Sequence, residues 1–322
     1  MSSLAAISQA AFGDIPAPLR GWLLQLHGVA EGQKPTCRLT LLYEELPACL
    51  EYFQSLGLEM LIDELPSDAL RFGPQSPKLR AEMRRLKHVR VYLARSWSDA
   101  RDLYRAEAKA KDYADIGLRL GYPVCCVEAA EAADEMTWNI EAQEWRQTNL
   151  VAVGIEASTR ADFHCNHLLI ESTIASFGPV SCIAHYPCRL DCEASSKIGE
   201  AALSIASRRW PLWHEVLIPL LKAPVLYWPD TDWPPDFWQE YAGLALLGAT
   251  MRDDRTWSSE RAALPLASVD LPFPSQGITA GSLQDGGVLV QSPTATLHLS
   301  FDLFGKPWLI SWEDGTVRRL PL

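Results

Sequence analysis

The chain has 322 residues and a formal net charge of −11 at pH 7, with 48% hydrophobic and 21% charged residues. That composition is ordinary for a globular protein, and no apolar run approaches the ~20 residues that a membrane-spanning helix needs. The negative charge repels phosphate backbones and argues against broad binding of nucleic acid. The first sixteen residues lack a basic stretch and include Asp14, so no secretory signal is expected and we predict a cytoplasmic protein.

The N-terminal part, residues 1–95, is predicted to form a small α/β layer. Leu19, Trp22, Leu23 and Leu26 have the spacing of one helix face. Apolar runs predict strands at 38–43, 58–63 and 88–94, and helices are expected at 45–56, followed by Gly57, and at 78–86. Cys37 and Cys49 fall in this layer and are expected in its core.

Residues 96–222 are predicted to form a helical, cysteine-rich core. Its first stretch, 96–120, has an apolar stripe at steps of three and four residues, with Ser96 or Ser98 as its cap. A break is expected before Asp112, and Gly121 stands where helices commonly end in a left-handed residue.

A second group of helices is predicted after this point. Pro123 is expected at the first position of a helix that covers 124–136. Further helices are predicted at 139–147, 167–177 and 193–209, and Asp191 is expected to cap the last of them.

Residues 223–322 are predicted to form a mostly β appendage that is rich in tryptophan and proline. The segment 227–238 holds three prolines and three tryptophans, and Asp314-Gly315 between two apolar runs is a hairpin signal. The chain is therefore predicted to be α+β, with a small N-terminal α/β layer, a central cysteine-bearing helical core and this C-terminal region.

The first chemical motif is Gly121-Tyr122-Pro123-Val124-Cys125-Cys126. If a helix starts at Pro123, both cysteines lie in its first turn, where free backbone N–H groups and the helix dipole favour a thiolate. A thiolate is the form that binds metals or attacks electrophiles. The alternative is that Cys125 and Cys126 are two small buried hydrophobes at a helix contact.

The second motif contains Cys182, His185, Cys188 and Cys192. Tyr186-Pro187 precedes Cys188 as Tyr122-Pro123 precedes Cys125. We therefore expect a turn-to-helix junction ahead of a cysteine at both places. Eight cysteines in a cytoplasmic chain favour thiols or metal ligands over disulfides. The spacing matches neither zinc ribbons nor ferredoxins, and a buried structural role for the three cysteines is the alternative.

The third motif is His164-Cys165-Asn166-His167. Its two histidines are three residues apart, so both can face one way at a helix start. Isolated histidines are more often satisfied core or surface residues than ligands. We therefore predict Asn166, His167 and His185 as candidates for orientation and proton transfer in catalysis.

The two cysteine segments resemble a known family. The stretches 120–128 and 185–195 are similar to an uncharacterised prokaryotic family, a domain of unknown function marked by a Gly-Tyr-Pro-x-Cys-Cys motif and a later Pro-Cys-x-x-x-Cys-x-x-Ser motif. The similarity spans roughly residues 88–205. The resemblance implies that the cysteine segments belong together in one domain, and it implies no activity.

The leading hypothesis is an iron–sulfur cluster, with zinc as the alternative metal. The predicted ligands are Cys125 or Cys126, Cys188 and Cys192, with Cys182 or Cys165 as the fourth. Three ligands would leave an open metal position that could act as a Lewis acid on a small-molecule or peptide substrate.

Two other classes of function stay open. One is a metal-free thiol enzyme for sulfur transfer or redox chemistry, with Cys125 or Cys126 as nucleophile and Cys188 or Cys192 as resolving thiol. The other is a zinc-stabilised adaptor that binds a protein partner through the aromatic segment 227–238.

Overall fold

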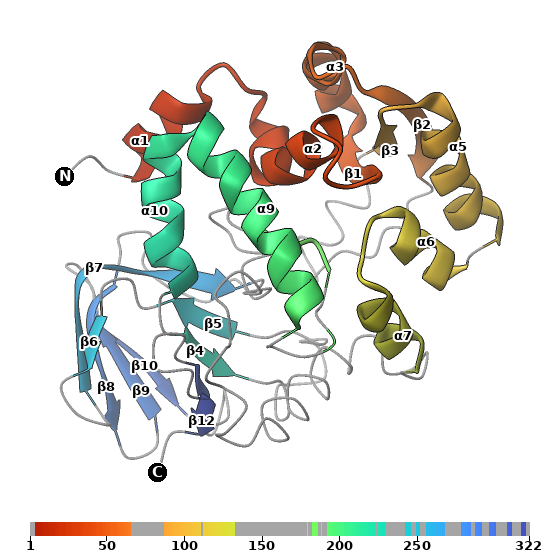
Figure 1. Cartoon of the computed structure of the whole chain (residues 1–322). Helices are drawn as coiled ribbons and strands as arrows, with labels where there is room; N and C mark the ends of the chain where they lie inside the picture. Colours follow the sequence, from red (N-terminus) through yellow and green to blue (C-terminus); the bar gives the residue numbers. More distant parts are fainter. Residues whose placement is uncertain are drawn as a thin grey trace.

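The structure is a computed structural model (Figure 1). It describes residues 4–65, 87–110, 112–132, 179, 182–185, 188 and 192–222, together with nine strands between 225 and 319. The predicted helices at 78–86, 139–147 and 167–177 lie outside the described residues. Within the described segments, no helix has both the length and the apolar character that crossing a membrane requires.

A three-stranded antiparallel sheet is the base of the N-terminal part. Strands β1 (Thr36–Leu42), β2 (Glu59–Leu65) and β3 (His88–Ala94) have the order β1-β3-β2. Since β3 is antiparallel to both neighbours, β1 and β2 run parallel to each other. The 3₁₀ turn η2 (Tyr43–Glu45) and helix α3 (Leu46–Ser55) connect them, which is a split β-α-β arrangement. The three predicted strands correspond to these.

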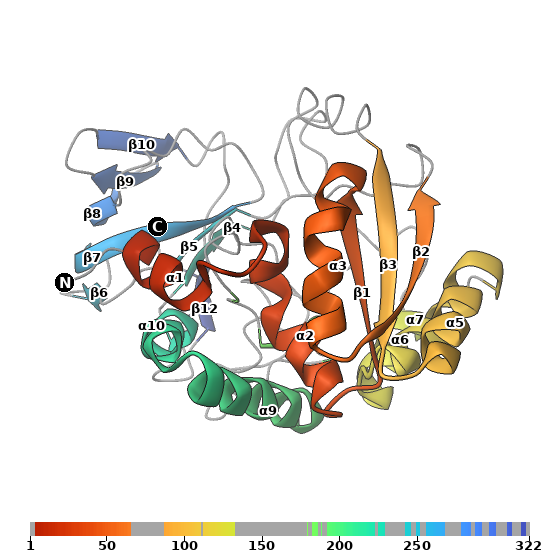
Figure 2. The same ribbon diagram turned by 90° about the horizontal axis from the view of Figure 1, so that it is seen from above.

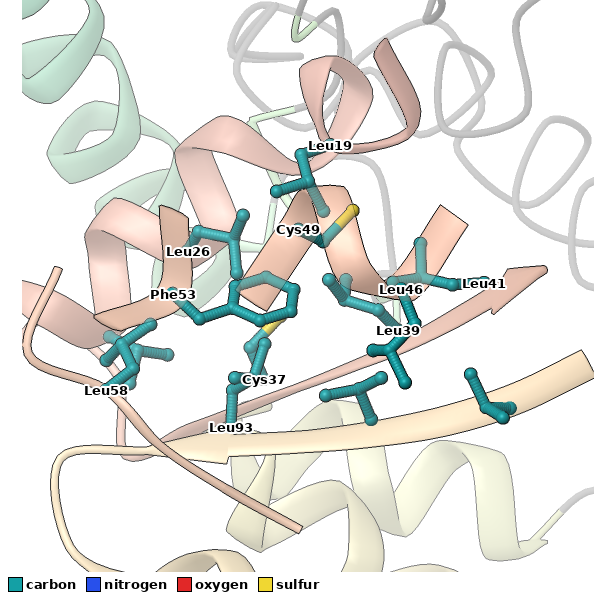
Figure 3. Close-up of a cluster of buried hydrophobic side chains, with 13 residues drawn as sticks. Leu19, Leu26, Cys37, Leu39, Leu41, Leu46, Cys49, Phe53, Leu58 and Leu93 are labelled. Carbon is teal, nitrogen blue, oxygen red and sulfur yellow. The ribbon is translucent and has the colours of Figure 1, made fainter. Parts of the chain in front are cut away.

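One face of the sheet packs on α3 and on α2 (Leu23–Ala30), which follows the 3₁₀ turn η1 (Ala17–Trp22). Figure 2 shows α2 and α3 lying along this face. Alternate residues of β3, such as Val91 and Leu93, point into this core, where Phe53 of α3 is fully buried (Figure 3). Cys37 and Cys49 lie in the same cluster, which confirms that they are core thiols.

The opposite face carries α5 (Trp97–Arg105), the π-helical turn η3 (Ala106–Ala110) and α6 (Tyr113–Arg119). Tyr92, Leu103 and Ile116 are buried together there. The Ser96 side chain accepts a hydrogen bond from the Asp99 N–H, and Asp112 caps α6 in the same way. The predicted break before Asp112 is therefore confirmed.

A shared carboxylate holds the π-helical turn against the sheet. Glu107 accepts hydrogen bonds from Arg38 of β1, at 2.6 Å, and from Arg90 of β3. The Glu107 side chain is only 14% exposed, so burial strengthens these ion pairs relative to surface pairs. The contact therefore ties the π-helical turn between α5 and α6 to two strands of the sheet.

The turn after α6 docks on the start of β1. Gly121 has φ 79°, and the N–H groups of Gly121 and Tyr122 donate to Leu118 and Gly117, which closes a Schellman motif. A Cβ at Gly121 would lie 2.9 Å from Cδ of Pro35. Only glycine satisfies both the positive φ and this close approach.

Helix α7 (Val124–Ala132) begins directly after this turn. The Pro123 carbonyl accepts hydrogen bonds from Cys126 and Val127, so Pro123 opens the helix and α7 starts at Val124, as predicted. Both cysteines lie in the first turn. Residues 133–136 of the predicted helix lie outside the described part.

Helices α9 (Glu193–Arg209) and α10 (Pro211–Lys222) pack on α2 and on α1 (Leu4–Phe12), respectively. The ring of Phe12 meets Trp210 and Trp213 edge-on, with centroids 5.6 and 5.2 Å away. The predicted helix at 193–209 is confirmed with the same bounds. Its cap is Cys192 and not Asp191, which places a thiol where the helix begins.

Polar contacts link α2 to two of its neighbours, α9 and α3. Arg208 and Arg209 donate to the two carboxylate oxygens of Glu31, at 2.6 and 2.9 Å. His27 shares a hydrogen bond of 2.9 Å with the Tyr52 hydroxyl. Burial, reinforced by the charge of Arg209, lowers the pKa of His27 to about 4, so this histidine is neutral in the folded protein.

The C-terminal strands form one antiparallel sheet with the order β10-β9-β8-β7-β5-β4-β11-β12, and β6 pairs with β7. The strands are β4 (Val225–Trp228), β5 (Ala242–Ala245), β6 (Ala249–Met251), β7 (Thr256–Ala267), β8 (Ile278–Gln284), β9 (Gly287–Gln291), β10 (Thr296–Ser300), β11 (Trp308–Ile310) and β12 (Val317–Arg319). The connecting stretches lie outside the described residues, so the mostly β character of 223–322 and the division into three parts stay predictions.

Replacing Gly121 by alanine is expected to destabilise the protein more than the same change at Gly57. Both glycines have positive φ, which costs alanine about 1 kcal/mol or more. A Cβ at Gly57 has no neighbour within 4 Å, whereas one at Gly121 meets Pro35, which adds about 1–3 kcal/mol. Denaturant unfolding measures the difference, and equal losses would contradict the close contact at Gly121.

The free energy of unfolding is expected to fall as pH drops from about 6.5 toward about 4, partly because of His27. The pKa of His27 is lower in the folded chain than in the unfolded chain, so its contribution is complete above pH 6.5 and is lost on acidification. His27→Gln should show a shallower fall between pH 7 and 4.5. If the free energies of unfolding of the two proteins fall in parallel with pH, His27 does not contribute to the loss of stability, since the other effects of acid are common to both.

Candidate metal centre

Two helix starts bring four thiols together. Cys125 and Cys126 are the second and third residues of α7, Cys192 caps α9, and Cys188 lies four residues before Cys192. The N-terminal end of α9 lies near α7 (Figure 1). The four Sγ atoms all lie within 4.8 Å of one another, so these cysteines can hold a metal ion.

The sulfur atoms are close to van der Waals contact. Sγ of Cys192 lies 3.8 Å from that of Cys125 and 3.7 Å from that of Cys126, and the adjacent pair is 4.0 Å apart. Cys126 and Cys192 are buried, Cys188 is half-buried and Cys125 is exposed. The group thus has one side that reaches solvent.

Only some of the predicted site residues lie in the four-thiol group. The four-thiol group contains Cys125, Cys126, Cys188 and Cys192 and does not include Cys182, which is buried at 1% exposure. The sequence predicted that Cys125 or Cys126 would be a ligand, and the structure places both of them in the group. His164, Cys165, Asn166 and His167 lie outside the described residues.

Hydrogen-bond donors converge on the sulfur of Cys126. The Cys188 N–H donates to it at 3.3 Å, and Oγ of Ser195 lies 3.4 Å away. Nε2 of His185 lies 2.8 Å from the same Oγ. When Cys126 is a thiolate, the single Ser195 O–H donates to the sulfur, and the oxygen then accepts from the Nε2–H of His185.

The thiols cannot all ionise without a cation. Burial, with the repulsion of Cys192, raises the pKa of Cys126 to about 11, and burial together with Cys126 also raises the pKa of Cys188. Burial opposes ionisation of Cys192 as well, but hydrogen bonds from Ser195 lower its pKa to about 7. A bound cation reverses this balance, because it stabilises all four thiolates.

His185 is a neutral hydrogen-bonding residue beside the thiols. Burial and the charge of Lys34 lower its pKa to about 3, and its ring lies on Tyr122 with centroids 5.0 Å apart. Lys34 reaches this region between α2 and the Gly121 turn, and its Nζ donates to Oε1 of Gln25 at 2.7 Å. The Ser195 hydroxyl thus lies between His185, the predicted proton carrier, and the Cys126 sulfur.

Sequence reasoning missed Ser195 and Lys34. Ser195 carried a signal, because it is the serine that ends the Pro-Cys-x-x-x-Cys-x-x-Ser motif, three residues after Cys192. Lys34 carried none, since it lies about 150 residues before His185 and belongs to no motif. Its position depends on how α2 and the Gly121 turn pack.

No protein-family model, no curated protein and no solved structure matches this chain. The resemblance of the two cysteine motifs to the uncharacterised family therefore stays a prediction. What can be said of the site depends on its own geometry.

Replacing Ser195 by alanine is expected to destabilise the folded protein by about 1–3 kcal/mol, because the buried Nε2–H of His185 loses its acceptor. Ser207→Ala is the matched control on the same helix, where the serine is exposed and the cost should stay within about 0.5 kcal/mol. Denaturant unfolding tests both variants, and equal effects would contradict the role of the His185–Ser195 contact.

Proposed function

We propose that this is a metal-centre protein in which Cys125, Cys126, Cys188 and Cys192 together hold a single tetrahedral ion, with zinc as the first candidate. The observation that carries the proposal is the mutual distance of the sulfurs, all within 4.8 Å. The donor set is four thiols, which suits zinc and other soft metals.

The distances favour one ion over a cluster. Four sulfurs placed at the Zn–S distance of ~2.3 Å on a tetrahedron lie about 3.8 Å apart. The three sulfur pairs that involve Cys125, Cys126 and Cys192 are 3.7–4.0 Å apart. In a [4Fe–4S] cluster each thiolate binds a different iron, so the ligand sulfurs must spread farther.

The role that fits this donor set is structural. Four protein ligands close the coordination shell of zinc, as in structural sites, and leave no position for substrate. The ion would join α7, which is tied to the sheet through the Gly121 turn, to α9, which packs on α2. Among the functions considered from the sequence, a zinc-stabilised adaptor fits this arrangement best. The two motifs also support the proposal that these segments form one domain of the similar family.

An iron–sulfur enzyme is the second candidate. The observation in its favour is the N–H and O–H donation to the sulfur of Cys126, because hydrogen bonds to cysteine sulfur tune the potential of such clusters. This alternative requires the four sulfurs to move apart when the cluster is inserted. His185 and Ser195 would then lie beside the cluster.

Metal and sulfide analysis of protein purified without oxygen separates the candidates. We expect about one zinc per chain, no acid-labile sulfide and no visible absorption, because a d¹⁰ ion is colourless. A brown protein that contains iron and acid-labile sulfide would contradict the zinc site and favour the iron–sulfur cluster. A folded protein that carries neither metal would contradict both and favour the metal-free thiol enzyme.

Single substitutions identify the ligands in the same assay. Serine at position 125, 126, 188 or 192 should remove most of the bound metal, because each variant breaks the four-thiolate shell. Cys182→Ala is the matched control, since this buried cysteine stands outside the group, and it should keep its metal. Loss of metal in Cys182→Ala with retention in Cys125→Ser would contradict the proposed ligand set.

A further inference from the structure

The four sulfurs of the centre differ in how they are protected. Cys126 is buried and accepts from the Cys188 N–H and the Ser195 hydroxyl. Cys192 is buried, with 3% of its surface exposed. Cys125 is exposed, and within the described part of the chain its sulfur has only other thiols as hydrogen-bond neighbours.

Those differences decide which sulfur can react. A metal-bound cysteine is held as a thiolate at neutral pH, and the thiolate is the nucleophilic form. A hydrogen bond to the sulfur occupies a lone pair and stabilises the thiolate, which lowers its reactivity. Burial additionally blocks approach. Of the three sulfurs compared above, only that of Cys125 has neither form of protection.

The surroundings of Cys125 favour an uncharged reagent. Val124, its neighbour in the first turn of α7, is 59% exposed and offers an apolar approach. Glu128 is exposed and lies three residues after Cys125, on the same side of the helix. A zinc ion with four thiolates has a net charge of about −2, so both it and Glu128 repel anions.

We propose that Cys125 is the reactive thiolate of the metal centre and a site of covalent modification by uncharged, soft carbon electrophiles such as alkyl halides and α,β-unsaturated carbonyl compounds. With an alkyl halide, the Sγ lone pair attacks carbon, an S–C bond forms, the carbon–halogen bond breaks, and halide leaves with the bonding pair. With an α,β-unsaturated carbonyl compound, the lone pair attacks the β-carbon, the carbon–carbon π bond breaks, and the resulting enolate takes a proton from water. Neither step needs an oxidant or a reductant. The inference rests on the proposed function, because the metal keeps the sulfur ionised.

Peptide mapping of the zinc-loaded full chain tests the proposal. The protein is treated with less than one equivalent of iodoacetamide, and the label on each cysteine is quantified by mass spectrometry. We expect Cys125 to react at least about tenfold faster than Cys126 and Cys192. Both of these sulfurs are buried, and a hydrogen bond to a charged sulfur stabilises that of Cys126 further, by about this factor or more. The core thiols Cys37 and Cys49 should stay unlabelled.

A second reagent tests the charge preference. Relative to their rates with free cysteine, iodoacetate should react with Cys125 more slowly than iodoacetamide does. Glu128→Gln should raise the iodoacetate rate and leave the iodoacetamide rate unchanged, since it removes one repelling charge. Equal relative rates for the two reagents in the unchanged protein would overturn the preference for uncharged electrophiles.

The outcomes separate this inference from the proposed function, because zinc is measured in the same sample. Uniform labelling of the four thiols, or labelling of Cys188 ahead of Cys125, in protein that holds one zinc overturns the inference and leaves the metal centre standing. Protein that holds no metal after zinc loading overturns both. Chelator treatment should abolish the selectivity, and a preference that survives it unchanged would exclude a role for the metal.

Discussion

The repulsion that four thiolates would exert on one another in one small space is the constraint on which the chemistry of this site depends. The sulfurs of Cys125, Cys126, Cys188 and Cys192 lie within 4.8 Å of one another, two of them buried. Burial raises the pKa of Cys126 and Cys188, so the group cannot become four thiolates by itself. A divalent cation would remove that penalty, and the four cysteines are close enough to hold one.

The scaffold brings the thiols together through contacts that are individually ordinary. Gly121 lets the turn before α7 settle on Pro35 at the start of β1. The ion pairs of Glu31 with Arg208 and Arg209 hold α9 along α2. Both helix starts are thereby fixed to the same small sheet and its helices. An ion bound between them would connect two segments that are about 65 residues apart in the chain.

Local sequence motifs predicted much of the thiol site. Tyr-Pro before Cys125 predicted a turn-to-helix junction that carries thiols, and α7 begins there, at Val124. The second Tyr-Pro lies outside the described residues, and α9 begins at Glu193, directly after Cys192. The fourth member of the thiol group could not be decided in this way. Adjacent cysteines diverge by about 100° on a helix, which suggested that one of them would face away. At the first turn of α7, both sulfurs still reach Cys192.

The sequence by itself determined the elements: the strands at β1, β2 and β3, the break before Asp112, the end of α6 at Gly121 and the bounds of α9. Hydrophobic period, caps and glycine act within a few residues, so one sequence suffices to read them. Only the tertiary structure decided that Cys182 stands outside the thiol group, that Ser195 and His185 lie beside it, and that the charge of Lys34 acts on His185. It also decided which sulfur is exposed. These properties depend on distances between segments far apart in the chain, which packing sets and local pattern does not encode.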